Sequence, residues 1–182
     1  SLYEILRTQP GVAVSNAGGA GSPTSLRIRG EEGYRTLMLL DGIDISDTSS
    51  PQIGPRVEQL LSSGIQRVEI LRGPQGLLYG ADAGGVVNIT TIAPRDGLGG
   101  EVSAEGGRYG TQQFAGNVGG GNETVDFNLS AADFSTDGFN ARTDDDTLAD
   151  NDGYDNTTVH GRFGWNASNN LRLGLAVHDI DA

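Results

Sequence analysis

The chain has 182 residues, no cysteine and a formal net charge of −12. Because a protein needs a basic face to neutralise phosphates, this charge argues against a nucleic acid as a partner. The lack of cysteine excludes disulfides and thiolate metal sites, and the sequence has no run of 18 apolar residues that would predict a transmembrane helix.

The N-terminal residues predict a short helix. Ser1 and Glu4 have the spacing of a capping box, the apolar residues Leu2, Ile5 and Leu6 lie on one face, and Pro10-Gly11 ends the helix. An exported protein begins with a targeting segment, and none is present here. We therefore expect the chain to be part of a longer protein.

The remainder of residues 1–96 predicts a mixed domain in which short strands alternate with Gly-rich turns. A Gly/Ser/Pro loop follows the first of these strands. A second short helix is expected over 55–61, with Val57, Leu60 and Leu61 pointing inward. The expected strands are residues 12–14, 26–29, 35–40, 65–72 and 85–92.

From residue 98 onward, apolar and polar residues alternate with a period of two, as in extended strands. Runs of about 10 residues have the length of a tilted membrane strand. Tight turns are expected at Tyr109-Gly110 and at 167–170, and a long Asp-rich connection at 137–156. Short turns on one side and long loops on the other are typical of an outer-membrane barrel, but a soluble antiparallel sheet with one wet face would show the same alternation.

Five short runs in a fixed order carry a family resemblance. They are Ile28-Arg29-Gly30, Leu39-Leu40-Asp41-Gly42-Ile43, residues 65–74, Leu78-Tyr79-Gly80 and residues 85–89. Together they resemble the plug domain of TonB-dependent outer-membrane receptors. The resemblance predicts an α+β plug domain, a small mixed sheet with short helices, over 1–96, and antiparallel β-strands of an incomplete outer-membrane β-barrel over 97–182. It also implies that a TonB box precedes Ser1 and that most of the barrel follows Ala182.

The resemblance implies transport without enzymatic activity and without a required cofactor. Such a receptor binds a metal chelate, either cobalamin or a ferric siderophore, and imports it with energy from the TonB system. The implied location is the outer membrane of a Gram-negative bacterium, and the implied partners are TonB, the chelate and the lipid around the full barrel. The alternative is a secreted or surface β-rich ligand-binding module without transport, which the polar loops and alternating strands also fit.

The resemblance gives Arg29 and Arg72 the role of a plug latch, in which each guanidinium pairs with a carboxylate of the barrel wall. A buried guanidinium needs bidentate partners, and losing them costs about 3–5 kcal/mol. The residues themselves leave a second interpretation open, in which each arginine pairs locally with Glu69 or Asp41.

Residues 16–25 and 46–54 resemble the apical loops through which these plugs contact their substrates. Ordinary polar turns have the same composition. The candidate ligand-facing residues are Gly21, Ser22, Asp47, Ser49 and Gln52.

The Asp-rich connection resembles a Ca²⁺-binding loop of cobalamin-transporting members of this family. Its candidate metal ligands are Asn140, Asp150 and Asp152. Carboxylates at alternate positions before a glycine suit Ca²⁺, although the spacing is not that of an EF-hand and Asn140 stands where a carboxylate is expected. The alternative is a solvated run of repelling charges.

The two histidines, His160 and His178, occupy polar positions of their expected strands. Their separation in sequence alone predicts neither a zinc site nor a catalytic base. The sequence also lacks the G-x-S-x-G pattern of a nucleophile elbow.

Overall fold

The computed structural model describes residues 1–47, 54–72, 79, 84–141 and 151–182. The chain divides into two compact units, Ser1–Thr91 and Ile92–Ala182. This division and the expected domain boundary between residues 96 and 97 both fall in the connection 92–98, which has no regular secondary structure. Within the described residues, no helix is long and apolar enough to cross a membrane.

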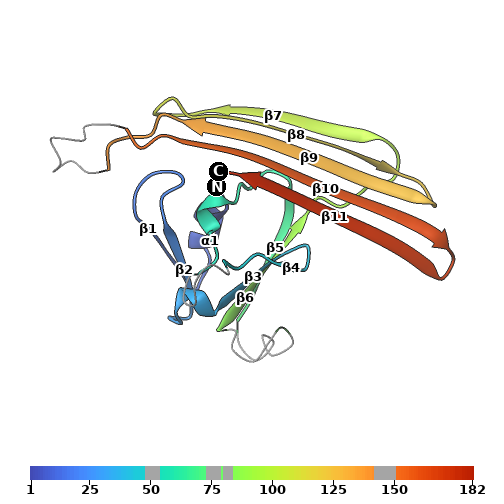
Figure 1. Cartoon of the computed structure of the whole chain (residues 1–182), viewed down its shortest axis with the longest axis horizontal. Coiled ribbons are helices and arrows are strands. Elements are labelled where there is room, and N and C mark those ends of the chain that lie inside the picture. Colours follow the sequence, from blue (N-terminus) through green and yellow to red (C-terminus); the bar gives the residue numbers. More distant parts are fainter. Residues whose placement is uncertain (48–53, 73–78, 80–83, 142–150) are drawn as a thin grey trace. The chain divides into compact units, whose positions relative to one another are not determined.

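The first unit combines two small sheets with short helices (Figure 1). Its elements are α1 (Leu2–Arg7), β1 (Val12–Asn16), β2 (Thr24–Ile28), the 3₁₀ turn η1 (Gly33–Arg35), β3 (Thr36–Leu40), β4 (Ile43–Asp44), the 3₁₀ turn η2 (Val57–Gln59), β5 (Ile65–Leu71) and β6 (Gly85–Thr91). Strands β1 and β2 form an antiparallel pair, and the other sheet has the order β4-β3-β6-β5. Only the β3–β6 pair of this four-stranded sheet is parallel, so the sheet is mixed, as predicted.

Helix α1 begins as the sequence predicts. The Glu4 carboxylate accepts hydrogen bonds from the Ser1 amino group and from Ser1 Oγ, each at 3.2 Å. Leu2 and Leu6 are buried, whereas Ile5 is 48% exposed, so the buried stripe is narrower than expected. After the helix, the chain enters β1 through Gly11, whose φ is +73°.

The second helix is shorter than the predicted span 55–61. Only the 3₁₀ turn η2 forms, because Leu60 already has an extended backbone with φ −90° and ψ 113°. Its three apolar residues are nevertheless buried as expected: Val57 at 0%, Leu60 at 5% and Leu61 at 3% exposure.

The apolar core lies in the first unit. A Cβ on Gly85 would lie 2.7 Å from Ile28 Cδ1, so the start of β6 packs against β2 without room for any side chain. The largest fully buried apolar side chains are Leu2, Leu6, Leu26, Ile28, Met38, Leu40, Val57, Val86, Val87 and Ile89.

The second unit is one antiparallel sheet in which consecutive strands are neighbours (Figure 1). Its strands are β7 (Gly99–Gly106), β8 (Gln112–Gly121), β9 (Val125–Thr136), β10 (Tyr154–Ser168) and β11 (Leu171–Asp181). The predicted turn at Tyr109-Gly110 is present, with φ of 59° and 65° at its two residues. The β10–β11 turn is confined to Asn169 and Asn170. The long connection ends at Gly153, three residues earlier than expected, because β10 begins at Tyr154.

The two faces of this sheet differ in polarity, as the period of two predicts. The polar face buries Asn128, Ser130, Asn156, Thr158 and His160. The other face exposes large apolar side chains: Val102, Phe114, Val118, Val125, Phe127, Leu129, Phe163, Trp165, Leu171, Leu173, Leu175 and Val177. A sheet of this kind needs an apolar environment on one side.

Candidate functional site

The two latch candidates come together at the turn between α1 and β1. The backbone N–H of Arg29 donates to the carbonyl of Gly11 at 2.8 Å. A Cβ on Gly11 would lie 3.7 Å from Nη1 of Arg72. Two motifs that are distant in the sequence therefore meet at one glycine. Arg29 itself has a left-handed backbone with φ 56°, which ends β2 and which non-glycine residues rarely adopt.

Glu69 and Asp41, the possible local partners of the two arginines, bind other residues. Glu69 pairs with Arg67 at 3.4 Å and accepts from Asn88 Nδ2 at 3.1 Å. Asp41 accepts from the N–H and Oγ1 of Thr91, at 3.0 and 2.5 Å. In the part of the chain that the structure describes, none of the ion pairs includes Arg29 or Arg72.

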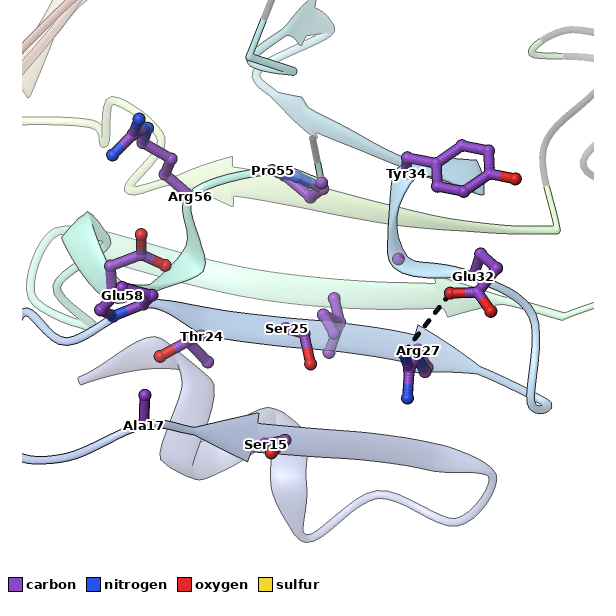
Figure 2. Close-up of a pocket in the computed structure, with 14 residues that line it drawn as sticks. Ser15, Ala17, Thr24, Ser25, Arg27, Glu32, Tyr34, Pro55, Arg56 and Glu58 are labelled. Carbon is purple, nitrogen blue, oxygen red and sulfur yellow. Dashed lines mark hydrogen bonds and ion pairs between the residues drawn. The ribbon is translucent and has the colours of Figure 1, made fainter. Parts of the chain in front are cut away.

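The roots of the two candidate ligand-facing loops line a pocket of about 570 Å³ (Figure 2). Its walls come from β1, β2, η1 and residues 54–58. Figure 2 shows Glu58, Arg56 and Thr24 at one end of the pocket and Arg27, Glu32 and Tyr34 at the other. The lining residues are Ser15, Ala17, Pro23, Thr24, Ser25, Leu26, Arg27, Glu32, Gly33, Tyr34, Gly54, Pro55, Arg56 and Glu58.

Two ion pairs organise the charges of this pocket. Arg27 Nη2 lies 3.4 Å from a Glu32 oxygen, and Arg56 Nε lies 2.9 Å from Oδ2 of Asp47. Asp47, a predicted ligand-facing residue, is thereby held beside Arg56. Its hydrogen bond and charge raise the pKa of Arg56 above the ordinary value.

Glu58 is a buried carboxyl that sequence analysis did not single out. It is 8% exposed, and its Oε2 has no hydrogen-bond partner among the described residues. Burial raises the pKa of Glu58, while hydrogen bonds from its own backbone N–H and that of Thr24, and the charge of Arg56, oppose the shift. The only sequence signal was an acidic residue between inward-facing Val57 and Leu60, which is too weak to distinguish it from a solvated one.

The first candidate loop is held by hydrogen bonds at its base. Asn16 Nδ2 donates to the carbonyl of Ser22 and to Oγ1 of Thr24, and Asn16 Oδ1 accepts from the N–H of Gly18. Gly21 has a φ of 73°, so this position requires glycine. Gly21 and Ser22 are half-buried, and Ser49 and Gln52 of the second loop lie outside the described residues.

Two of the three candidate calcium ligands, Asn140 and Asp152, lie within the described residues. Asp152 Oδ2 accepts from the backbone N–H of Ala141 at 2.9 Å, and the Asp152 N–H donates to the Phe139 carbonyl at 3.3 Å. Asn140 is therefore brought next to Asp152, while Asp150 lies outside the described residues. Among the residues that are described, no three His, Asp or Glu side chains cluster as a metal site.

Residues 1–87 match the family model described as "TonB-dependent Receptor Plug Domain". Together with the antiparallel sheet, this match shows that the chain belongs to the TonB-dependent receptors. Its first half is their plug domain, and its second half resembles part of their barrel. This family assignment places the protein in the outer membrane of a Gram-negative bacterium.

Among individual proteins, the chain is similar to the vitamin B12 transporter BtuB of Photobacterium profundum. The two are 34% identical over 177 residues, which cover 96% of this chain and 28% of the relative. The chain thus spans little more than a quarter of the length of that relative.

Solved structures share the fold. The siderophore receptor PirA from Acinetobacter baumannii superposes with a TM-score of 0.77 at 23% identity, over 97% of this chain and 28% of that one. A variant of the ferric enterobactin receptor PfeA from Pseudomonas aeruginosa, in complex with enterobactin, gives a TM-score of 0.77 at 22% identity, over 98% and 30%. At such identities the likeness concerns the fold alone.

The raised pKa of Glu58 predicts how the stability of the plug depends on pH. The folded state binds this proton more tightly than the unfolded state does. The free energy of unfolding should therefore fall as pH rises from the ordinary value of Glu, about 4.3, through the raised pKa. Glu58→Gln removes the buried charge, so it should stabilise the plug at neutral pH and flatten this dependence. The measurement is protease cleavage of the plug in urea series between pH 4 and pH 8.

Glu32→Gln is the matched control, because Glu32 lines the same pocket but is exposed. It should leave the pH profile as it is in the wild type. An unchanged profile for Glu58→Gln would contradict the assignment of this dependence to Glu58.

Proposed function

We propose that this chain is the substrate-binding and gating part of a receptor that imports a metal chelate, cobalamin or a ferric siderophore, with energy from the TonB system. The observation that carries the proposal is a plug fold joined in one chain to an amphipathic antiparallel sheet. Cobalamin is the first choice, because the 34% identical relative is a vitamin B12 transporter. The proposed role has no catalytic step.

The sheet supports a location in a membrane rather than a secreted binding module. Large apolar side chains are exposed on one face of all five strands, and the polar residues are on the other face. A soluble module would leave this apolar face in water, at a cost of about 25 cal/mol for each Å². Outer-membrane barrels place such a face against lipid.

The pocket supports contact with a substrate near the roots of the two loops. Glu58 binds the N–H of Thr24 near the end of the candidate segment 16–25, and Arg56 binds Asp47 near the start of the candidate segment 46–54. These contacts couple both loops to residues 54–58. Substrate bound between the loops would therefore act on one connected segment of the plug.

Arg29 and Arg72 form the latch that holds the plug in place. The Arg29 backbone and the Arg72 side chain both lie at Gly11, which supports a shared position for the two latch residues. Separating a buried ion pair is costly, because each charge is then left buried without its partner. This behaviour suits a plug that must remain closed until TonB pulls.

The latch is tested by Arg72→Ala in the outer-membrane protein. Loss of one partner of a buried pair should raise the rate of protease cleavage within the plug by at least about tenfold, which corresponds to about 1.4 kcal/mol. Arg67→Ala, on β5 just before Arg72, is the matched control, since Arg67 is exposed and pairs with Glu69. Equal rates of cleavage of the Arg72→Ala and wild-type plugs would refute the proposed latch.

Uptake measurements test the function itself. The native protein that contains this chain is produced in a Gram-negative host without its own cobalamin and siderophore receptors. We expect uptake of labelled cobalamin that disappears when TonB is deleted. If only a ferric siderophore is taken up, the proposed function stands and the substrate is a siderophore instead of cobalamin. If neither compound is taken up in a TonB-dependent way, the proposed function is refuted.

We also propose that Asn140, Asp150 and Asp152 bind Ca²⁺, since Asp152 and Asn140 are neighbours at the base of the acidic connection. Ca²⁺ takes six to eight oxygen ligands, which this connection supplies in excess. Addition of Ca²⁺, but not of Mg²⁺, should slow hydrogen exchange of residues 137–153. Asp152→Asn should abolish this effect of Ca²⁺. If Ca²⁺ does not change hydrogen exchange in the wild type, the proposed calcium site is refuted.

A further inference from the structure

The only two histidines of the chain are cross-strand partners. His160 of β10 is in register with His178 of β11. Their Nδ1 atoms lie 3.0 Å apart, and their rings meet edge to face with centroids 5.1 Å apart at 70°. His160 is 4% exposed and His178 is half-buried, so the surrounding side chains restrict the rotation of both rings.

The pair ends a row of polar residues that crosses the whole sheet. The register places Glu101, Asn117, Ser130, His160 and His178 side by side on β7 to β11, all on the face opposite the exposed apolar side chains. The histidines therefore do not face lipid in the membrane location proposed above. Two nitrogen ligands on this face can reach a hydrated ion, whereas the apolar face could not.

The distance between the two nitrogens matches that between ligands of one metal ion. A first-row transition ion bonds histidine nitrogen at about 2.0–2.1 Å, so two such ligands lie about 2.9 Å apart at a 90° angle and about 3.4 Å apart at the tetrahedral angle. The observed 3.0 Å is close to the 90° value. Angles of about 90° are those of square-planar and tetragonal sites, which Cu²⁺ and Ni²⁺ prefer, whereas Zn²⁺ prefers the tetrahedral angle.

We propose that His160 and His178 chelate a divalent transition cation through their Nδ1 atoms, with Cu²⁺ bound more tightly than Ni²⁺ or Zn²⁺. This order follows both from the geometry and from the general ranking of such ions at nitrogen ligands. No third His, Asp or Glu joins the pair within the described residues, so water completes the coordination. Without metal, one imidazole donates its Nδ1–H to the other.

The positive charge of Arg162 limits the affinity of this site. Arg162 lies on the same face of β10, two residues from His160 and opposite Ala176 of β11. A bound dication is repelled by this guanidinium, so we expect a site that exchanges its ion rather than one that holds it permanently. The bound ion would also tie β10 to β11, because each strand supplies one ligand.

Electron paramagnetic resonance of Cu²⁺ bound to the native protein in detergent tests the proposal. The wild type should show one Cu²⁺ with hyperfine structure from two equatorial nitrogens that belong to this site. His160→Gln and His178→Gln should each remove this signal and raise the Cu²⁺ dissociation constant by at least about tenfold. Glu123→Gln, at an exposed carboxylate between β8 and β9, is the control for adventitious binding to surface acids, and it should leave the signal unchanged. Heat-dependent gel mobility establishes that each variant is folded.

A second measurement needs only the wild type. Ascorbate reduces the bound Cu²⁺ to Cu⁺, which reduces dissolved O₂ to reactive oxygen species that oxidise the side chains ligating the metal. Mass spectrometry then locates the oxidised residues. Oxidation at both His160 and His178 supports the site. The proposal is overturned if oxidation occurs only elsewhere, if the two-nitrogen signal is absent, or if either histidine variant binds Cu²⁺ as tightly as the wild type.

Discussion

The alternation of side chains along extended strands is the constraint on which this structure depends. Successive residues of a strand point to opposite faces, so one sequence period separates an apolar face from a polar face over five strands. A shift of register by one residue would move the apolar side chains of a strand to the polar face and its polar side chains to the apolar face. The energy of burial therefore fixes the register. The same constraint puts His160 and His178 on one face and Trp165 and Leu173 on the other.

The first unit combines its apolar core with close backbone approaches. Gly85 lets β6 meet Ile28 of β2, and Gly11 lets Arg29 and Arg72 approach one turn. Polar contacts at Glu58 add a link between the roots of two loops. Specific contacts of this kind can be lost locally without unfolding of the whole unit, which is compatible with the gating role proposed above.

Much of the fold could be predicted from sequence because it depends on local patterns. The capping box at Ser1 and Glu4, the positions of the strands and the two faces of the sheet all follow from spacing alone. The sites depend on distant pairings, which spacing does not reveal. The approach of Arg72 to Gly11 requires the packing of β5 beside α1, and the contact between the two histidines requires the register of β10 and β11. The burial of Glu58 likewise depends on β2, which lies far earlier in the chain.

The parallel pairing of β3 with β6 has a consequence for the order of folding. Thr36 pairs with Gly85, so the centre of the four-stranded sheet joins residues 49 positions apart. Closing such a long loop costs conformational entropy before any contact repays it, and pairings of this kind form slowly. While the chain is being synthesised and exported, β3 has no inner neighbour until β6 arrives. During that interval its nearly continuous apolar strand, Thr36–Leu40, is open to pairing and aggregation with other chains.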